Sequence, residues 1–193
     1  MTTNTTPHTN HILAAYMRAS EDDRAFGIAW YPAARALAEN LLPEDVSTAA
    51  GVLAAMSPMT SWPENVKRAT VAIMGGKVSH TGPNVDKVLR ILSGEHPLDV
   101  LSGPKTRAFY LNIMGIDSDE TVTVDRHAID VACGNVLSDS DRAGAIRGKA
   151  GYGKVAGMYR EAASVIGITP CALQAVVWVY WRRNVAQAFH GDA

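Results

Sequence analysis

Residues 101–130, LSGPKTRAFYLNIMGIDSDETVTVDRHAID, form the most informative stretch of this chain. A Gly-Pro turn places Lys105 at the start of a helix predicted over 106–114. Residues 121–124 alternate as a strand would, but the sequence offers no second run of this kind to pair with them. We therefore expect an extended segment that enters a helix at Asp125. The simplest interpretation of Asp125 is a helix cap, and that of Lys105 is a solvated surface residue.

On either side of this stretch, apolar residues recur with helical spacing, as Ile12, Ala15 and Ala19 do on one face;. Residues 1–10 are polar and lack this spacing, so we expect a loosely attached arm. The sequence predicts a single all-α domain over 11–193, made of short helices. These are expected at 12–19, 31–42 with Pro32 in the first turn, 46–56, 61–73 with Ser61 and Glu64 as a capping box, 84–92, 97–101, 151–166 and 169–189;.

Composition limits the classes of function. The 193 residues are 47% hydrophobic, and 18 Lys and Arg against 19 Asp and Glu leave a net charge of −1. A near-neutral chain has no global field that attracts polyanions, so nucleic-acid binding needs a local basic patch. The sequence starts without a signal-peptide pattern, and no run is long and apolar enough to cross a bilayer. We expect a soluble, cytoplasmic protein with no membrane partner.

Metal and cofactor sites are not indicated. The two cysteines, Cys133 and Cys171, form no Cys-x-x-Cys pair, which argues against a Cys-held zinc or iron–sulfur site;. The histidines form no His-x-x-x-His pair. Residues 148–154 have the spacing of a phosphate-binding P-loop, but Val155 stands where a Ser or Thr must reach Mg²⁺;. We expect no metal and no cofactor.

The stretch 142–160 is locally basic and glycine-rich, with no acidic residue in it. A flexible loop of this kind can follow a phosphate backbone. A solvated loop that leads into a helix explains the same composition equally well. The cations of this stretch are Arg142, Arg147, Lys149, Lys154 and Arg160, of which Arg147, Lys149 and Lys154 are our DNA-binding candidates.

The stretch 101–130 resembles the helix–hairpin–helix, Gly-Pro-Asp (HhH-GPD) superfamily of DNA glycosylases, the family of endonuclease III. In that family a Gly-rich hairpin ending in Lys-Thr is followed by a helix and then by Val-Asp-x-His. Residues 54–70, 84–92 and 173–182 are similar to further helices of the family, in the same order. The matching positions in the stretch are Gly103, Lys105, Thr106, Asn112, Val124, Asp125 and His127.

The resemblance implies a compact, multi-helix, all-α fold, and this chain departs from the family pattern at several places. The hairpin at residues 101–105 is shorter than usual, and Pro104 removes a backbone donor that could bind phosphate;. The iron–sulfur loop of endonuclease III is absent. Short phage-type members, some of them proposed to act in thymine hypermodification, are the nearer comparison. The implied partner is DNA, and the implied activity is on a base or a base–sugar bond.

Breaking a C1′–N bond generates oxocarbenium character on the sugar, which a carboxylate can stabilise. The resemblance gives this role to Asp125. Lys105 is the candidate amine for attack at C1′, with Arg107 or Arg126 as cations that would favour its neutral form. The expected substrate contacts are Arg107, Arg126 and His127, together with Met59, Trp62 and Tyr110, which would line a pocket or fill the gap left by a flipped base unless they are ordinary packing residues.

Two other classes of function fit the same residues. A non-catalytic nucleic-acid-binding or inhibitory module would keep the fold without the chemistry. An enzyme that acts on free nucleotides would suit the near-neutral charge and the shortened hairpin.

Overall fold

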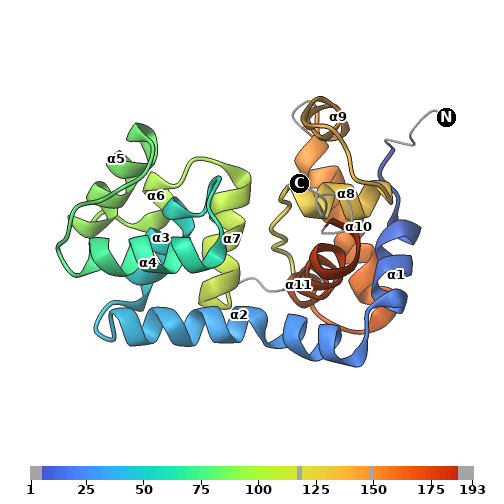
Figure 1. Ribbon diagram of the computed structural model, residues 1–193, viewed down its shortest axis with the longest axis horizontal. Coiled ribbons are helices and arrows are strands. Elements are labelled where there is room, and N and C mark those ends of the chain that lie inside the picture. Colours follow the sequence, from blue (N-terminus) through green and yellow to red (C-terminus); the bar gives the residue numbers. More distant parts are fainter. Residues whose placement is uncertain (1–5, 117–118, 148–149, 187–193) are drawn as a thin grey trace. The chain divides into compact units, whose positions relative to one another are not determined.

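The computed structural model describes residues 6–116, 119–147 and 150–186, and every regular element in them is a helix (Figure 1). The all-α prediction is confirmed for these residues. They divide into two compact units, each considered by itself. Unit 1 joins the residues up to Tyr31 with those from 119 onward, and unit 2 is Pro32–Ile116. The expectation of a single domain over 11–193 stays a prediction.

Unit 1 gathers its helices around α11, whose apolar residues are mostly buried. Helices α1, α8 and α10 pack against it. Fully buried aliphatic side chains from all four helices fill the space between them, and each contributes about 1.5–3 kcal/mol to stability;. The elements of unit 1 are α1 (Thr9–Arg18), the first half of α2 (Glu21–Leu41), α8 (Arg126–Cys133), α9 (Asp139–Ala145), α10 (Gly151–Ile166), α11 (Pro170–Trp181) and η1, a π-helical turn (Arg182–Ala186).

Unit 2 surrounds α3, an Ala-rich helix that is buried along most of its length. Its small residues let neighbouring helices approach closely: a Cβ on Gly51 would lie 2.6 Å from Cγ of Pro97. The helix begins at its cap Asp45, whose Oδ1 accepts the N–H of Thr48 at 3.0 Å. The elements of unit 2 are the second half of α2, α3 (Val46–Met56), α4 (Trp62–Ile73), α5 (Gly82–Leu92), α6 (Pro97–Val100) and α7 (Pro104–Met114).

The segment 121–124 is extended, as predicted, and leads to the start of α8. A side chain of α10 takes the place of a neighbouring strand. The hydroxyl of Tyr152 donates to the Val122 carbonyl at 2.8 Å and accepts the Val124 N–H at 3.0 Å. Burial raises the pKa of Tyr152 to about 12, so the hydroxyl keeps the proton that this contact needs. Tyr152 therefore holds the segment that delivers Asp125 to its helix.

Helices α2 and α11 differ from their predicted boundaries. α2 begins at Glu21, so Pro32 lies inside the helix and not in its first turn. Pro32 is exposed, and water can therefore satisfy the carbonyl whose hydrogen bond the proline removes;. α11 ends at Trp181, and the predicted end of that helix at Phe189 lies outside the described residues.

Two predictions of local structure are wrong. The capping box is not formed, because Ser61 makes no side-chain cap bond and Glu64 pairs with Arg68 at 2.7 Å. The loop expected from residue 142 is not a loop at its start, because residues 142–145 belong to helix α9, which begins where Oγ of Ser138 accepts the Asp141 N–H at 3.2 Å. Helical spacing is hard to detect there because α9 buries none of its residues.

In the described residues, no single helix is long and apolar enough to span a bilayer. α10 and α11 with η1 meet the criteria of length and composition only as a pair, and that pair is bent by 97°.

Candidate functional site

Asp125 caps the N-terminus of α8, as its simplest interpretation predicted. Its Oδ1 accepts the N–H of Ala128 at 2.8 Å, and its Oδ2 accepts the indole N–H of Trp178 at 3.1 Å. The side chain is half-buried. A carboxylate has about four lone-pair sites, so two donors fix its orientation and leave both oxygens able to accept another hydrogen bond. Capping and a chemical role are therefore compatible at Asp125.

Trp178 is held in place by its neighbours in unit 1. The guanidinium of Arg182 lies 4.7 Å from the centre of its ring, and Trp30 meets it edge to face with ring centroids 6.0 Å apart. Trp30 in turn packs on Tyr31, whose hydroxyl donates to Oε1 of Gln174 at 2.9 Å. The indole N–H therefore reaches the carboxylate from a firmly packed ring.

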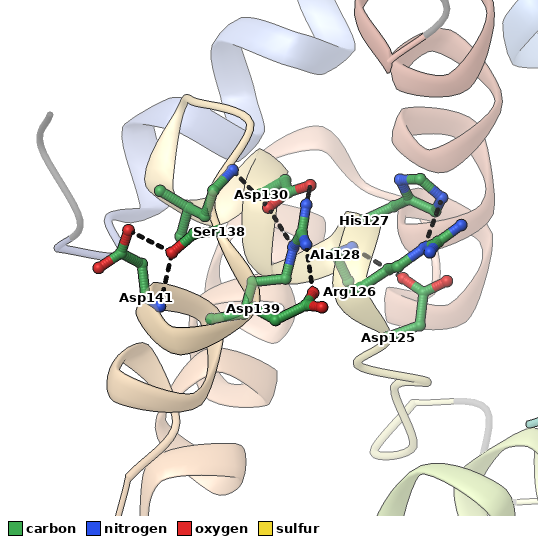
Figure 2. A network of polar contacts seen from close by, with 10 residues as sticks. Asp125, Arg126, His127, Ala128, Asp130, Ser138, Asp139 and Asp141 are labelled. Carbon is green, nitrogen blue, oxygen red and sulfur yellow. Dashed lines mark hydrogen bonds and ion pairs between the residues drawn. The ribbon is translucent and has the colours of Figure 1, made fainter. Parts of the chain in front are cut away.

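Arg126 and His127 form the first turn of α8 beside this carboxylate (Figure 2). Arg126 is exposed, and its Nε donates to Nε2 of His127 over a long 3.4 Å. Nδ1 of His127 is buried without a hydrogen-bond partner in the described residues. Burial is the main reason that the pKa of His127 is lowered; Asp125 opposes this shift, and Arg126 and Arg182 add to it. The imidazole is therefore neutral at physiological pH.

Asp130 lies further along α8 (Figure 2). It forms a buried ion pair with Arg142 of α9. Its Oδ1 accepts from Nε of Arg142 and its Oδ2 from Nη2, both at 2.8 Å, and Oδ1 also accepts the Leu137 N–H at 3.2 Å. Asp130 is only 1% exposed. The expectation that Arg142 belongs to a flexible basic loop is wrong, because its guanidinium joins α9 to α8.

The rest of the basic stretch is also structured. Arg160 lies on α10 and donates to the Glu120 carbonyl at 3.1 Å. Arg147 and Lys154 are exposed and form no ion pair in the described residues, whereas Lys149 lies outside those residues. In the described part of this stretch, Arg147 and Lys154 remain candidates for a phosphate contact.

Lys105 lies in the first turn of α7, in unit 2, and is half-buried. Within the described ranges its ammonium group has no hydrogen bond or ion pair. Asp125 belongs to the other unit, unit 1. Arg107 donates through Nη1 to the carbonyls of Leu98 and Leu101, the second at 3.0 Å. Its guanidinium is therefore already used to stabilise the turn that precedes α7.

Met59 lies on the turn between α3 and α4 and is 97% exposed, so it is not a core residue. Its φ of 56° is in the left-handed region, which is uncommon for a residue other than glycine;. His80 supports this turn, because its Nε2 lies 3.1 Å from both Oγ1 of Thr60 and the carbonyl oxygen of Pro58. An apolar side chain is thus presented to solvent by a braced turn.

Trp62 and Tyr110 lie in the packing of unit 2. Trp62 is half-buried and meets Phe109 edge to face, with ring centroids 6.2 Å apart. Tyr110 is 2% exposed, and its hydroxyl lies 2.9 Å from Oγ of Ser47. For Tyr110, the structure matches the packing alternative.

Comparison with known proteins finds one family that matches this chain. A family model described as DUF7178, a family of unknown function, matches residues 1–185. The chain belongs to this family. No curated protein and no solved structure matches it.

Trp178 and Arg182 are the residues of this DUF7178 member that the sequence analysis missed. A spacing of four residues on one helix was a usable signal, because it places the guanidinium over the ring one turn earlier. The contact of Trp178 with Asp125 has no such signal, since 53 positions separate the two residues. In the described residues, no group of His, Cys, Asp or Glu side chains could hold a metal ion.

Proposed function

We propose that this DUF7178 member is a DNA glycosylase-like protein of the HhH-GPD type, acting on a base or a base–sugar bond in DNA, with Asp125 as its central acid. The observation that carries the proposal is the Asp125 carboxylate, which is half-buried and oriented by the Ala128 N–H and the Trp178 indole. A carboxylate fixed in this way can face developing positive charge without reorganising.

The order of the elements supports the resemblance. Lys105 lies in the first turn of α7 and Asp125 at the start of α8, with an extended segment before the acid. Those are the positions that the resemblance to a Lys-Thr hairpin and a Val-Asp-x-His element requires.

The proposed hydrolysis uses water as the nucleophile. As the C1′–N bond breaks, its electron pair stays on the base nitrogen, which then takes a proton from solvent. The water oxygen bonds to C1′, and Asp125 accepts the proton that this water loses. The negative charge of Asp125 also stabilises the oxocarbenium-like sugar, an effect worth several kcal/mol of barrier.

Lys105 is the alternative nucleophile, in place of water. Attack of its Nζ on C1′ would expel the base, and ring opening of the sugar would leave an imine. Borohydride reduces such an imine to a stable secondary amine, so it should trap a protein–DNA adduct that Lys105→Gln abolishes. A glycosylase that cannot be trapped on an abasic strand would use water alone.

Met59 is proposed to act in a separate step, the extrusion of the target base from the duplex. Enzymes that act on a base in a duplex extrude it, and apolar side chains inserted between base steps help to unstack them. An exposed methionine on a turn braced by His80 can act as such a wedge. Met59→Ala should then weaken action on duplex DNA more than on single strands.

The deciding experiment measures base release from oligonucleotides that contain uracil, oxidised, alkylated or hydroxymethylated bases. Asp125→Asn should keep the fold, because Asn can still accept from the backbone, yet lose turnover by at least about a hundredfold. Asp22→Asn, an exposed acid of the same unit, is the matched control and should stay active. Full activity in Asp125→Asn, or no base release by the wild-type protein, would contradict the proposal.

A further inference from the structure

We propose that Arg126 and Arg182 together bind a phosphate group beside Asp125. The inference deepens the proposed function and rests on it for the choice of a nucleotide as ligand. The contact itself can be measured without base release.

Two other arginines of unit 1 already have a buried acidic partner. Arg142 pairs with Asp130, and Arg183 pairs with Asp23 at 2.7 Å. Arg126 and Arg182, by contrast, are both exposed and have no carboxylate partner within the described ranges. Two guanidinium groups therefore remain able to bind an anion.

Arg182 is ordered before any ligand arrives. Its guanidinium stacks 4.7 Å from the centre of the Trp178 ring, while the N–H of that ring contacts Asp125. A stacked guanidinium keeps its N–H edge available for bidentate contacts and loses less entropy on binding. Arg182 also begins the π-helical turn η1, and π-helical turns are frequent at functional sites;.

Arg126 and Arg182 act on a common neighbour. Nε of Arg126 contacts Nε2 of His127 at 3.4 Å, and Arg182 stacks on the ring whose N–H contacts Asp125, the residue before Arg126. In agreement with this geometry, both positive charges lower the pKa of His127 in addition to the effect of burial. The nearby carboxylate of Asp125 already accepts two N–H groups. The positive charge of the two guanidinium groups is therefore only partly balanced at this place.

Phosphate is the anion that this arrangement fits best. Its oxygens accept the paired N–H groups of a guanidinium, and two such forks can share one phosphate. A phosphate held by Arg126 and Arg182 would lie near the Asp125 carboxylate, which is proposed to face the sugar. The same chemistry can come from a phosphodiester in a DNA strand or from the phosphomonoester of a free nucleotide.

The test measures binding of a fluorescent DNA oligonucleotide and of a deoxynucleoside 5′-monophosphate over a range of salt concentrations. Arg126→Gln and Arg182→Gln should each weaken DNA binding and reduce the slope of log K against log[salt] by about 0.7–0.9. Arg18→Gln, an exposed cation of the same unit outside this site, is the control for net charge and should change neither. Arg182→Lys should restore the salt slope but only part of the affinity.

The ligand source follows from which probe responds. Sensitivity of oligonucleotide binding alone identifies a strand phosphodiester, and sensitivity of monophosphate binding identifies a free nucleotide. Thermal unfolding of each variant shows that the fold is kept. Binding by both Gln variants that equals that of Arg18→Gln, or a wild-type protein that binds neither probe, would overturn the proposed site. Arginine-dependent binding without base release would instead remove the proposed function and leave the site in place.

Discussion

The indole N–H of Trp178 donates to Oδ2 of Asp125 at 3.1 Å and so joins α11 to the N-cap residue of α8. The guanidinium of Arg182 stacks on the same ring. One tryptophan thus orients the carboxylate and supports a cation. The three residues form a connected unit in which the loss of one contact should affect the others.

Trp178→Phe should separate the effect of the indole N–H from the effect of the aromatic ring. Phenylalanine still offers a face for Arg182 but has no donor for Asp125. Loss of a hydrogen bond to a charged group costs about 1.5–3 kcal/mol when buried, and we expect about 1 kcal/mol here because the pair is half-exposed;. Urea unfolding measures this loss, and turnover should fall more than substrate binding.

The matched control for this variant is Trp181→Phe. Nε1 of Trp181 is buried without a hydrogen-bond partner in the described residues, so removing its N–H leaves no acceptor unsatisfied. Turnover in Trp181→Phe should therefore stay near that of the wild type. Equal losses of turnover in both variants would show that ring volume, and not the contact with Asp125, is what matters.

Stability should fall as the pH drops below about 6.5, the ordinary pKa of a histidine;. Burial lowers the pKa of His127 in the folded protein, so below this pH the unfolded chain binds the proton more readily than the folded chain. Linkage then lowers the free energy of unfolding from about pH 6.5 down through the folded pKa of His127. Urea unfolding at a series of pH values measures the slope.

His127→Gln should flatten this part of the pH profile. The Thr48 N–H holds the pKa of Asp45 below its usual value. Carboxyl groups of this kind titrate in a more acidic range and do not contribute to the slope just below pH 6.5. An unchanged slope in His127→Gln would place the titrating group elsewhere.

Arg142→Leu should be strongly destabilising. It would leave the Asp130 carboxylate buried without its cation, and breaking a buried pair from one side costs about 3–5 kcal/mol;. The exposed pair of Arg160 with Glu120 offers the comparison, because Arg160→Leu should cost under about 1 kcal/mol;. Chemical denaturation of both variants tests this, and equal losses would contradict the structural role of Asp130.

The sequence indicated Asp125 more clearly than it indicated the surroundings of Asp125. Alternation at residues 121–124 and an acid before an apolar helix are local signals, and both agree with the structure. The hydroxyl of Tyr152 that holds the segment comes from α10, and no local pattern announces such a contact. The same is true of Trp178, because helical periodicity identifies the buried face of a helix but not its partner.

For the basic stretch 142–160, the sequence indicated more unpaired cations than the structure has. Counting cations along the sequence indicated a loop with free charge, yet the partners of Arg142 and Arg160 come from outside the stretch. The first half of α2 was missed because Pro32 looks like the start of a helix and was taken as one;. The close approach of α11 at Gly27 stabilises that half in a way that the local sequence does not show.

Gly27→Ala should destabilise unit 1 although alanine is the better helix former. A Cβ at this position of α2 would lie 2.4 Å from Cα of Val176 and 2.6 Å from its backbone nitrogen, so α11 must move away. Overpacking of this kind costs about 1–3 kcal/mol or more, which exceeds the gain of up to about 1 kcal/mol in helix propensity. Gly153→Ala, on α10 with open space around its Cβ, should instead be neutral or stabilising by under about 1 kcal/mol;.

The effect of Gly27→Ala should also reach the proposed site. Trp30 lies one helical turn from Gly27 and meets Trp178 edge to face, so displacing α11 disturbs the ring that contacts Asp125. We expect the indole N–H resonance of Trp178, assigned by its loss in Trp178→Phe, to shift in Gly27→Ala and to stay in place in Gly153→Ala. An unshifted resonance together with wild-type stability would show that α2 and α11 do not depend on this close approach.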